Sequence, residues 1–244
     1  MALTGTNRGT GGNNTTSTTL AVVPPSNFTA GSYAVLCLAY DNSGASGADP
    51  FSSIVDNAGN TWTTLASRVY DPGAASAGVA GRIFGAQLGT LATTNTITIT
   101  FTNTTVAKAW VMHEITAGAG MVVSQYDPGF FSTGAATGTP SLSAIGVLTG
   151  DLVLGMGAAE SANTWVGDTD TVEGSWSAQQ ATGFGTTTSG ISITSQRKIT
   201  TGQVTTNQQY NPTLTSADVI VGVAQFREVA AFTRPKMTML LGVT

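Results

Sequence analysis

The chain has 244 residues, which suffice for one large β domain or for two domains of about 110 residues each. Only 9% of the residues are charged, against roughly 25% in ordinary soluble domains, so Thr, Ser, Asn and Gly must cover most of the surface. The formal net charge is -4 and the Lys and Arg residues are scattered, so the sequence offers no basic surface for phosphates and nucleic-acid binding is not expected.

The composition predicts an all-β fold with little or no helix. The chain contains 30 Gly and many Thr and Val residues, and clusters of Gly, Asn, Asp and Pro mark turns between short segments. No stretch approaches the roughly 18 apolar residues of a membrane helix, so no membrane partner is expected. The first residues lack the apolar core of a secretory signal, and we therefore expect synthesis in a cytoplasm without export by such a signal.

The N-terminal segment and the first apolar run have contrasting patterns. Residues 1–18 carry no periodicity and are rich in Gly and Asn, which predicts an extended arm. The run YAVLCLAY (33–40) is apolar on both faces, which predicts a central strand beneath a neighbouring sheet or a partner subunit. Cys37, the only cysteine, lies in this run and is expected to be a buried small hydrophobe rather than a reactive thiol.

The following segments add a half-buried strand and the only histidine. In TNTITITFTN (94–103) apolar residues alternate with Thr, which predicts a strand with one face toward a core. His113 lies in the apolar run WVMHEI, and the chain has no Gly-x-Ser-x-Gly elbow with a plausible histidine partner. A structural role is therefore expected for His113, and the chain is predicted not to be an enzyme.

Four blocks of the sequence recur in the same order, which predicts a tandem duplication. GSYAVLCLAYDNSG (31–44) matches GDLVLGMGAAESAN (150–163) without a gap, and each block ends on an acid that enters a polar loop. The turn around Trp62 matches that around Trp176; residues 77–87 match 189–199, and 108–115 match 219–226. We predict two antiparallel β-sandwiches, jelly-roll-like or immunoglobulin-like, over residues 19–120 and 121–230.

The tetrapeptide YDPG occurs twice, at residues 70–73 and 126–129, but in places that do not correspond in this alignment. Asp, Pro and Gly favour successive positions of a tight turn. Both copies are therefore predicted to be turns, and neither is evidence for the repeat.

Two groups of residues are candidate binding sites. Asp168, Asp170 and Glu173 form the densest acidic group and are a weak candidate for calcium, with a solvated turn as the alternative. Three tryptophans, Trp62, Trp165 and Trp176, lie close to polar loops, where they would either stack on sugar rings or fill the core near the end of a sandwich. No cofactor is expected.

The C-terminal residues 231–244 are predicted to form a second arm that contacts a partner. A free terminal segment this apolar would be poorly soluble, so we expect it to pack on another subunit or back on its own chain. The alternative is a final strand of the second sandwich. The candidate interface residues are Arg234, Met237, Met239, Leu240 and Leu241.

The first half resembles a β-sandwich module of tailed-bacteriophage virion proteins and of some bacterial surface proteins. The resemblance rests on the strand start at Gly31, the D-x-x-G-N-x-W turn at 56–62, and an alternating strand followed by the apolar run at 108–115. The second half keeps GDLVLG at 150–155 but has DTVEGSW in place of DNAGNTW. No functional residue transfers from this resemblance, because its motifs describe a fold.

The resemblance implies a non-enzymatic structural component of a virion that is assembled in the cytoplasm of a bacterial host. Such proteins are usually symmetric, and a trimer is favoured. The first hypothesis is a capsid decoration or cement protein whose partners are the major capsid protein, other virion proteins and its own copies. The alternatives are a glycan-binding module of a tail fibre or host-attachment protein, and a tail or adaptor component.

Overall fold

The computed structural model describes residues 3–41, 49–71, 78–140, 142–186, 190–202 and 204–231. These residues contain strands and no helix, so the predicted all-β fold is confirmed. The strands of the first half are β1 (Thr4–Asn13), β2 (Ser17–Val22), β3 (Tyr33–Asp41), β4 (Phe51–Asp56), β5 (Thr63–Tyr70), β6 (Val79–Gln87), β7 (Ile97–Thr105) and β8 (Lys108–Thr116). Those of the second half are β9 (Met121–Thr137), β10 (Leu142–Val147), β11 (Leu152–Glu160), β12 (Trp165–Val166), β13 (Gln180–Phe184), β14 (Ile191–Ile199), β15 (Val204–Tyr210), β16 (Thr213–Leu214) and β17 (Ala217–Ala230).

Each half has a five-stranded inner sheet and a smaller outer layer, and strands pair only within their own half. The inner sheets have the orders β1-β8-β3-β6-β5 and β13-β14-β11-β17-β9. The outer layers are β2-β7-β4 in the first half and the pairs β10-β15 and β12-β16 in the second. Matched in chain order, the second half therefore repeats the pairing of the first, with β15 and β16 in the place of β7.

The aligned sequence blocks occupy equivalent places in the two inner sheets. Tyr33 pairs with Gln87 and Ile115, and Leu152, its counterpart, pairs with Ile199 and Phe226. The partners on β14 and β17 are the residues that the alignment assigns to those on β6 and β8. The two halves thus share strand order and register.

The turns before the central strands β3 and β11 are also equivalent. Gly31 and Gly150 both have a left-handed backbone, with φ of 78° and 88°, as the prediction of a turn glycine requires. The Gly31 amide donates to Leu88 O at 3.0 Å, and the Gly150 amide donates to Thr200 O at 2.8 Å. The same backbone bond therefore closes both turns.

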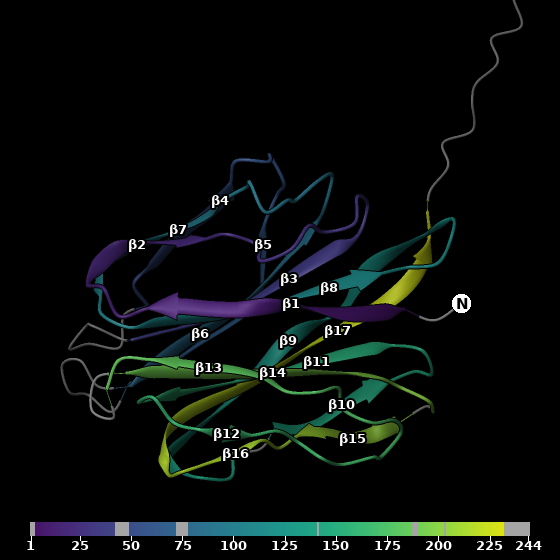
Figure 1. Ribbon diagram of the computed structural model, residues 1–244. Coiled ribbons are helices and arrows are strands. Elements are labelled where there is room, and N and C mark those ends of the chain that lie inside the picture. Colours follow the sequence, from purple (N-terminus) through teal and green to yellow (C-terminus); the bar gives the residue numbers. More distant parts are fainter. Residues whose placement is uncertain are drawn as a thin grey trace, which may run out of the picture.

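The two inner sheets pack face to face, so the molecule has four layers, with an outer layer on each side (Figure 1). The central core combines Val35, Cys37 and Val111 of the first half with Leu154 and Ile220 of the second. Strand β1 lies over β13, and β5 lies over β9. Each edge strand therefore lies over the counterpart of the opposite edge strand, since β13 corresponds to β5 and β9 corresponds to β1. An approximate twofold axis parallel to the strands would relate the two sheets in this way.

Strand β3 is buried on both faces, as its sequence predicts, because its sheet lies between two other layers. Val35 and Cys37 face the second half, whereas Leu36 and Leu38 face the outer sheet β2-β7-β4. The cover that the sequence left open, a sheet or a partner subunit, is the inner sheet of the second half. In β7 the predicted alternation is also confirmed, since its apolar residues Ile97, Ile99 and Phe101 are buried.

Aromatic rings from other elements pack against the glycines of β11, the central strand of the second half. Gly155 and Gly157 of β11 occupy the positions of Leu36 and Leu38 in β3. A Cβ atom on Gly155 would lie 2.4 Å from the Tyr210 ring, and one on Gly157 would lie 3.0 Å from the Trp165 ring. The two halves thus fill equivalent space with different residues.

The segment expected to be an N-terminal arm is instead an edge strand. Strand β1 pairs along β8, with a bulge at Arg8. The glycines that suggested an arm admit neighbouring side chains, because a Cβ atom on Gly11 would lie 2.5 Å from the Trp110 ring, and one on Gly12 would lie 2.7 Å from the Phe184 ring. The lack of periodicity therefore reflects close packing at a sheet edge.

The second YDPG copy is also different from its prediction, because it lies within strand β9. The register of β9 against β17 shifts on both sides of the pair Asp127–Gln225, so Pro128 stands beside a bulge. Strand β9 is at the edge of its sheet, where a proline needs no ladder partner on its outer side. In the first copy, Tyr70 ends β5, and Pro72 and Gly73 lie outside the described residues.

Candidate functional site

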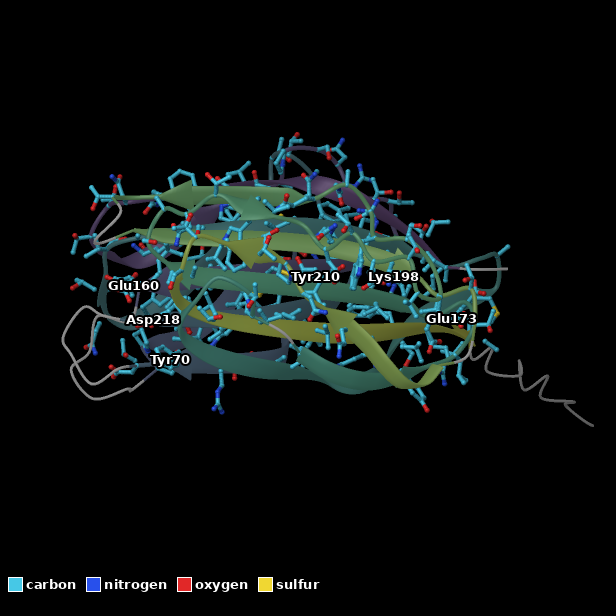
Figure 2. The ribbon with its side chains drawn as sticks, turned by 90° about the horizontal axis from the view of Figure 1, so that it is seen from below. Tyr70, Glu160, Glu173, Lys198, Tyr210 and Asp218 are labelled. Carbon is cyan, nitrogen blue, oxygen red and sulfur yellow. The ribbon has the colours of Figure 1, made fainter. Side chains whose placement is uncertain are left out.

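The acids at the ends of β3 and β11 meet at one end of the molecule. Asp41 and Glu160 hold matched positions, and the approximate twofold axis brings both to the same end. The Glu160 carboxylate accepts a hydrogen bond of 2.9 Å from the Gly78 amide of the first half. Figure 2 shows Glu160 and Asp218 at this end, with Glu173 at the opposite one.

The carboxyl groups of Asp41 and Glu160 both have raised pKa values. Burial and, to a smaller extent, the Glu160 carboxylate raise the pKa of Asp41 to about 6, against a still smaller opposing effect of Lys108. Burial also raises the pKa of Glu160; the Gly78 hydrogen bond opposes this shift and Asp218 adds to it. The pKa values of both carboxyl groups at this end of the molecule are therefore raised.

Lys108 stands beside this group but is held by backbone and hydroxyl oxygens. Its Nζ donates to Thr15 O at 2.8 Å, Thr105 O at 2.8 Å and Ser17 Oγ at 3.2 Å. Burial lowers the pKa of Lys108 to about 8, against the effect of Asp41. With three acceptors on its ammonium group, Lys108 ties β8 to the start of β2.

The loop after Glu160 borders a pocket of about 290 Å³. Ser161 has φ of 87°, which is rare for a residue other than glycine, and its amide donates to Gly190 O at 2.6 Å. The Asn163 amide donates to Ser161 O at 2.9 Å, which closes a three-residue turn. The pocket is lined by Ala162, Asn163, Thr164, Trp165, Ala181, Thr182 and Gly183.

Trp165, one of the candidate sugar-stacking residues, is 4% exposed and lies beneath this pocket. Its indole N–H donates to Ser192 Oγ at 3.0 Å. The ring packs on Gly157 and belongs to a small core with Ala159 and Val219. Almost none of the ring is therefore available to a sugar.

The other two tryptophans are half-buried in equivalent turns at the opposite end of the strands. The indole N–H of Trp62 donates to Asp56 at 2.8 Å, and that of Trp176 donates to Asp170 at 3.3 Å, six residues earlier in both cases. Trp62 packs against the core beneath β2-β7-β4, and Trp176 packs on the Tyr210 ring at 4.9 Å between centroids. Their stacking on a glycan stays a prediction.

Two of the three candidate calcium ligands, Asp168 and Asp170, are bonded to groups of the protein, and Glu173 lies at the same end of the molecule (Figure 2). Asp170 binds the Lys198 ammonium at 2.7 Å, and Asp168 accepts the backbone amides of Asp170 and Asn211. Burial opposes ionisation of Asp170, but the Lys198 bond outweighs it and the pKa lies below its usual range. Among the described residues, no three His, Cys, Asp or Glu side chains gather where they could hold a metal ion.

His113 lies in the interface between the two inner sheets and is fully buried. Its Nε2 is 2.8 Å from Ser195 Oγ of the second half, and its Nδ1 is 3.1 Å from Asn7 Oδ1. Burial and, to a smaller extent, the charge of Arg197 lower its pKa to about 3. Cys37, 3.8 Å from the same Ser195 hydroxyl, is also buried, and burial raises its pKa to about 12. Neither side chain is accessible to a substrate.

An ion pair at the start of β11, between the buried Asp151 and the partly exposed Arg227, was not predicted from the sequence. Arg227 donates two hydrogen bonds of 2.7 Å to the carboxylate of Asp151, and its guanidinium lies 3.5 Å from the centroid of the Tyr126 ring. The counterpart of Asp151 in the first half is Ser32, so the repeat gives no signal for this pair. The C-terminal candidates Arg234, Met237, Met239, Leu240 and Leu241 lie outside the described residues.

Comparisons of the chain with protein-family models, with curated proteins and with solved structures find no match. No helix long and apolar enough to cross a membrane occurs in the described part of the chain.

Proposed function

We propose that this chain is a non-enzymatic structural protein of a bacteriophage virion, in the first place a capsid decoration or cement protein. The virion assignment rests on the sequence resemblance of the first half. In this role the protein binds the major capsid protein and further copies of itself, with a trimer as the favoured assembly.

The positions of the reactive side chains support a role without catalysis. His113, Cys37 and Lys108 are all buried in the fold. His113 bridges the two inner sheets, and Lys108 is bonded to three oxygens. A general base or nucleophile must reach its substrate, so these groups stabilise the fold rather than act on a ligand.

The observation that carries the proposal is the outer face of β2-β7-β4. Its cross-strand rows are Thr19–Thr100–Ser53 and Ala21–Thr98–Val55, and their side chains point away from the core beneath. These rows contain no charged residue. Burying them against another protein desolvates no ion, and their methyl and hydroxyl groups suit a flat contact.

Immunogold labelling of purified tailed particles from a producing host tests the proposal. We expect gold at regular positions on the heads. Gold on tails or fibres would favour an alternative location, and unlabelled particles from cells that make the protein would refute a virion role.

The outer face is tested by the substitution Thr100→Lys, with Thr213→Lys on the exposed strand β16 as its control. A lysine in the middle of the face would have to lose its hydration on contact, so we expect reduced occupancy on particles for Thr100→Lys alone. Equal occupancy of both variants would remove this face from the interface.

A further inference from the structure

Two carboxylates are directed into the contact between the inner sheets at one of its ends. Ala39 and Ala158 belong to the central core, and Asp41 and Glu160 follow them by two residues on β3 and β11. Side chains at positions i and i+2 of a strand point to the same face, so both carboxylates point toward the opposite half. The Glu160 carboxylate accepts the Gly78 amide of the first half at 2.9 Å, which joins the halves at this end.

A third carboxylate and a phenol lie close to this pair. The pairing of β17 with β11 continues to Val219–Ala159, so Asp218 lies beside Glu160 in the same sheet. Figure 2 shows Tyr70, the last residue of β5, at the same end as Glu160 and Asp218. Carboxylates this close repel one another when they are ionised together.

Lys108 lies on the other face of the first inner sheet and compensates this repulsion only in part. It pairs with Tyr40, which belongs to the core beneath the outer sheet, and its ammonium group donates to three oxygens of the first half. Its effect on Asp41 is smaller than that of burial. Asp41 is 4% exposed, and its carboxylate accepts no hydrogen bond from the described residues. A buried carboxyl group in this environment is more stable without its charge.

Separation of the two halves at this end would expose both carboxylates to water. Hydration and screening would then remove the cost of their charges. We propose that loss of the Asp41 proton is a pH switch, so that the contact between the halves at Glu160 and Gly78 opens more often at neutral pH than at pH 5. The core in the middle of the contact stays closed. The switch is a property of the fold and does not rest on the proposed virion role.

The size of the switch follows from the pKa of Asp41 in the two states. It is about 6 in the closed state, against about 3.8 for a carboxyl group in water. Between pH 5 and pH 8 the ratio of open to closed molecules is therefore expected to rise about tenfold. Ionisation of Glu160, whose pKa is also raised, acts in the same direction.

Amide hydrogen exchange of the ¹⁵N-labelled full-length protein, measured by NMR between pH 5 and pH 8, tests this proposal. Protection is taken relative to an unstructured chain at the same pH, which removes the effect of base catalysis. We expect the Gly78 amide to be less protected than the Cys37 amide of the central strand β3, and its protection to fall about tenfold over this range. Constant protection at Gly78 would overturn the proposal. Equal protection of the two amides would also overturn it, because Gly78 would then exchange only through global unfolding.

Three variants identify the groups of the switch. Asp41→Asn is expected to abolish most of the fall in protection at Gly78, because the amide cannot ionise. Glu160→Gln keeps an acceptor for the Gly78 amide but removes the opposing charge, so the fall should become smaller. Glu173→Gln, at the opposite end of the molecule, should leave the fall unchanged (Figure 2). A full tenfold fall in Asp41→Asn would refute the switch.

Discussion

The substitution Asp41→Asn is expected to stabilise the protein at neutral and alkaline pH. Asp41 is 4% exposed, and Asn has the shape of the neutral acid without its charge. Its pKa is about 6 in the fold, against about 3.8 in the unfolded chain. The fold therefore opposes ionisation of Asp41, and above pH 6 it carries a cost that the amide does not have.

The size of the effect follows from the difference between the two pKa values. At 1.36 kcal/mol per pH unit, a difference of about 2 corresponds to about 3 kcal/mol at pH 8. Because the folded pKa is the higher one, the native state binds the proton more tightly, and the cost of ionisation declines as the pH falls from 6 to 4. At pH 4 the expected stabilisation by Asp41→Asn is below about 1 kcal/mol.

Urea unfolding of the parent and the variant at pH 8 and pH 4 measures both values. Glu173→Gln, at the opposite end of the molecule, controls for the removal of one negative charge (Figure 2). Equal effects of Asp41→Asn at the two pH values, or destabilisation at pH 8, would refute the reasoning. Loss of the favourable contact with Lys108 would then be the dominant effect of the substitution.

Three further substitutions test the packing and the buried polar groups. Gly155→Leu is expected to displace the Tyr210 ring and to lower the free energy of unfolding, measured in urea, by about 3 kcal/mol. An unchanged unfolding midpoint would contradict the packing of this ring on Gly155. Asp170→Asn is expected to lower the thermal unfolding temperature more than Asp56→Asn, because it also removes the negative charge that faces the buried Lys198 ammonium. The reverse order would contradict this role of the ion pair. His113 has a pKa of about 3 in the fold, so its imidazole is protonated in the unfolded state first as the pH falls. Between pH 7 and pH 5 the parent should therefore lose about 2 kcal/mol of unfolding free energy that His113→Gln does not lose. Equal losses would exclude a neutral buried imidazole.

The sequence predicts the strands of the repeat because their pattern is set by burial. Tyr33 and Leu152 start equivalent central strands, and their pairings match the alignment residue by residue. The equivalent turns at Gly31 and Gly150 are predictable for a similar reason, since only a residue without a side chain adopts that backbone easily.

Other features were missed because they depend on neighbours distant in the sequence. From the sequence, Gly11 of β1 indicates a flexible segment, and its packing role is visible only once the Trp110 ring is placed against it. From the sequence, Pro128 indicates a turn, and its place in a strand can be recognised only once β9 is known to lie at a sheet edge beside a bulge.

The symmetry of the fold explains why the candidate site lies where it does. With an approximate twofold axis along the strands, the ends of β3 and β11 meet at the same end of the molecule, and the loops that follow them lie there together. Glu160 illustrates the result, since it ends β11, accepts the Gly78 amide of the first half and directly precedes the strained Ser161. Because the inner faces are used to join the halves, the surfaces left for partners are the outer layers and these loop ends.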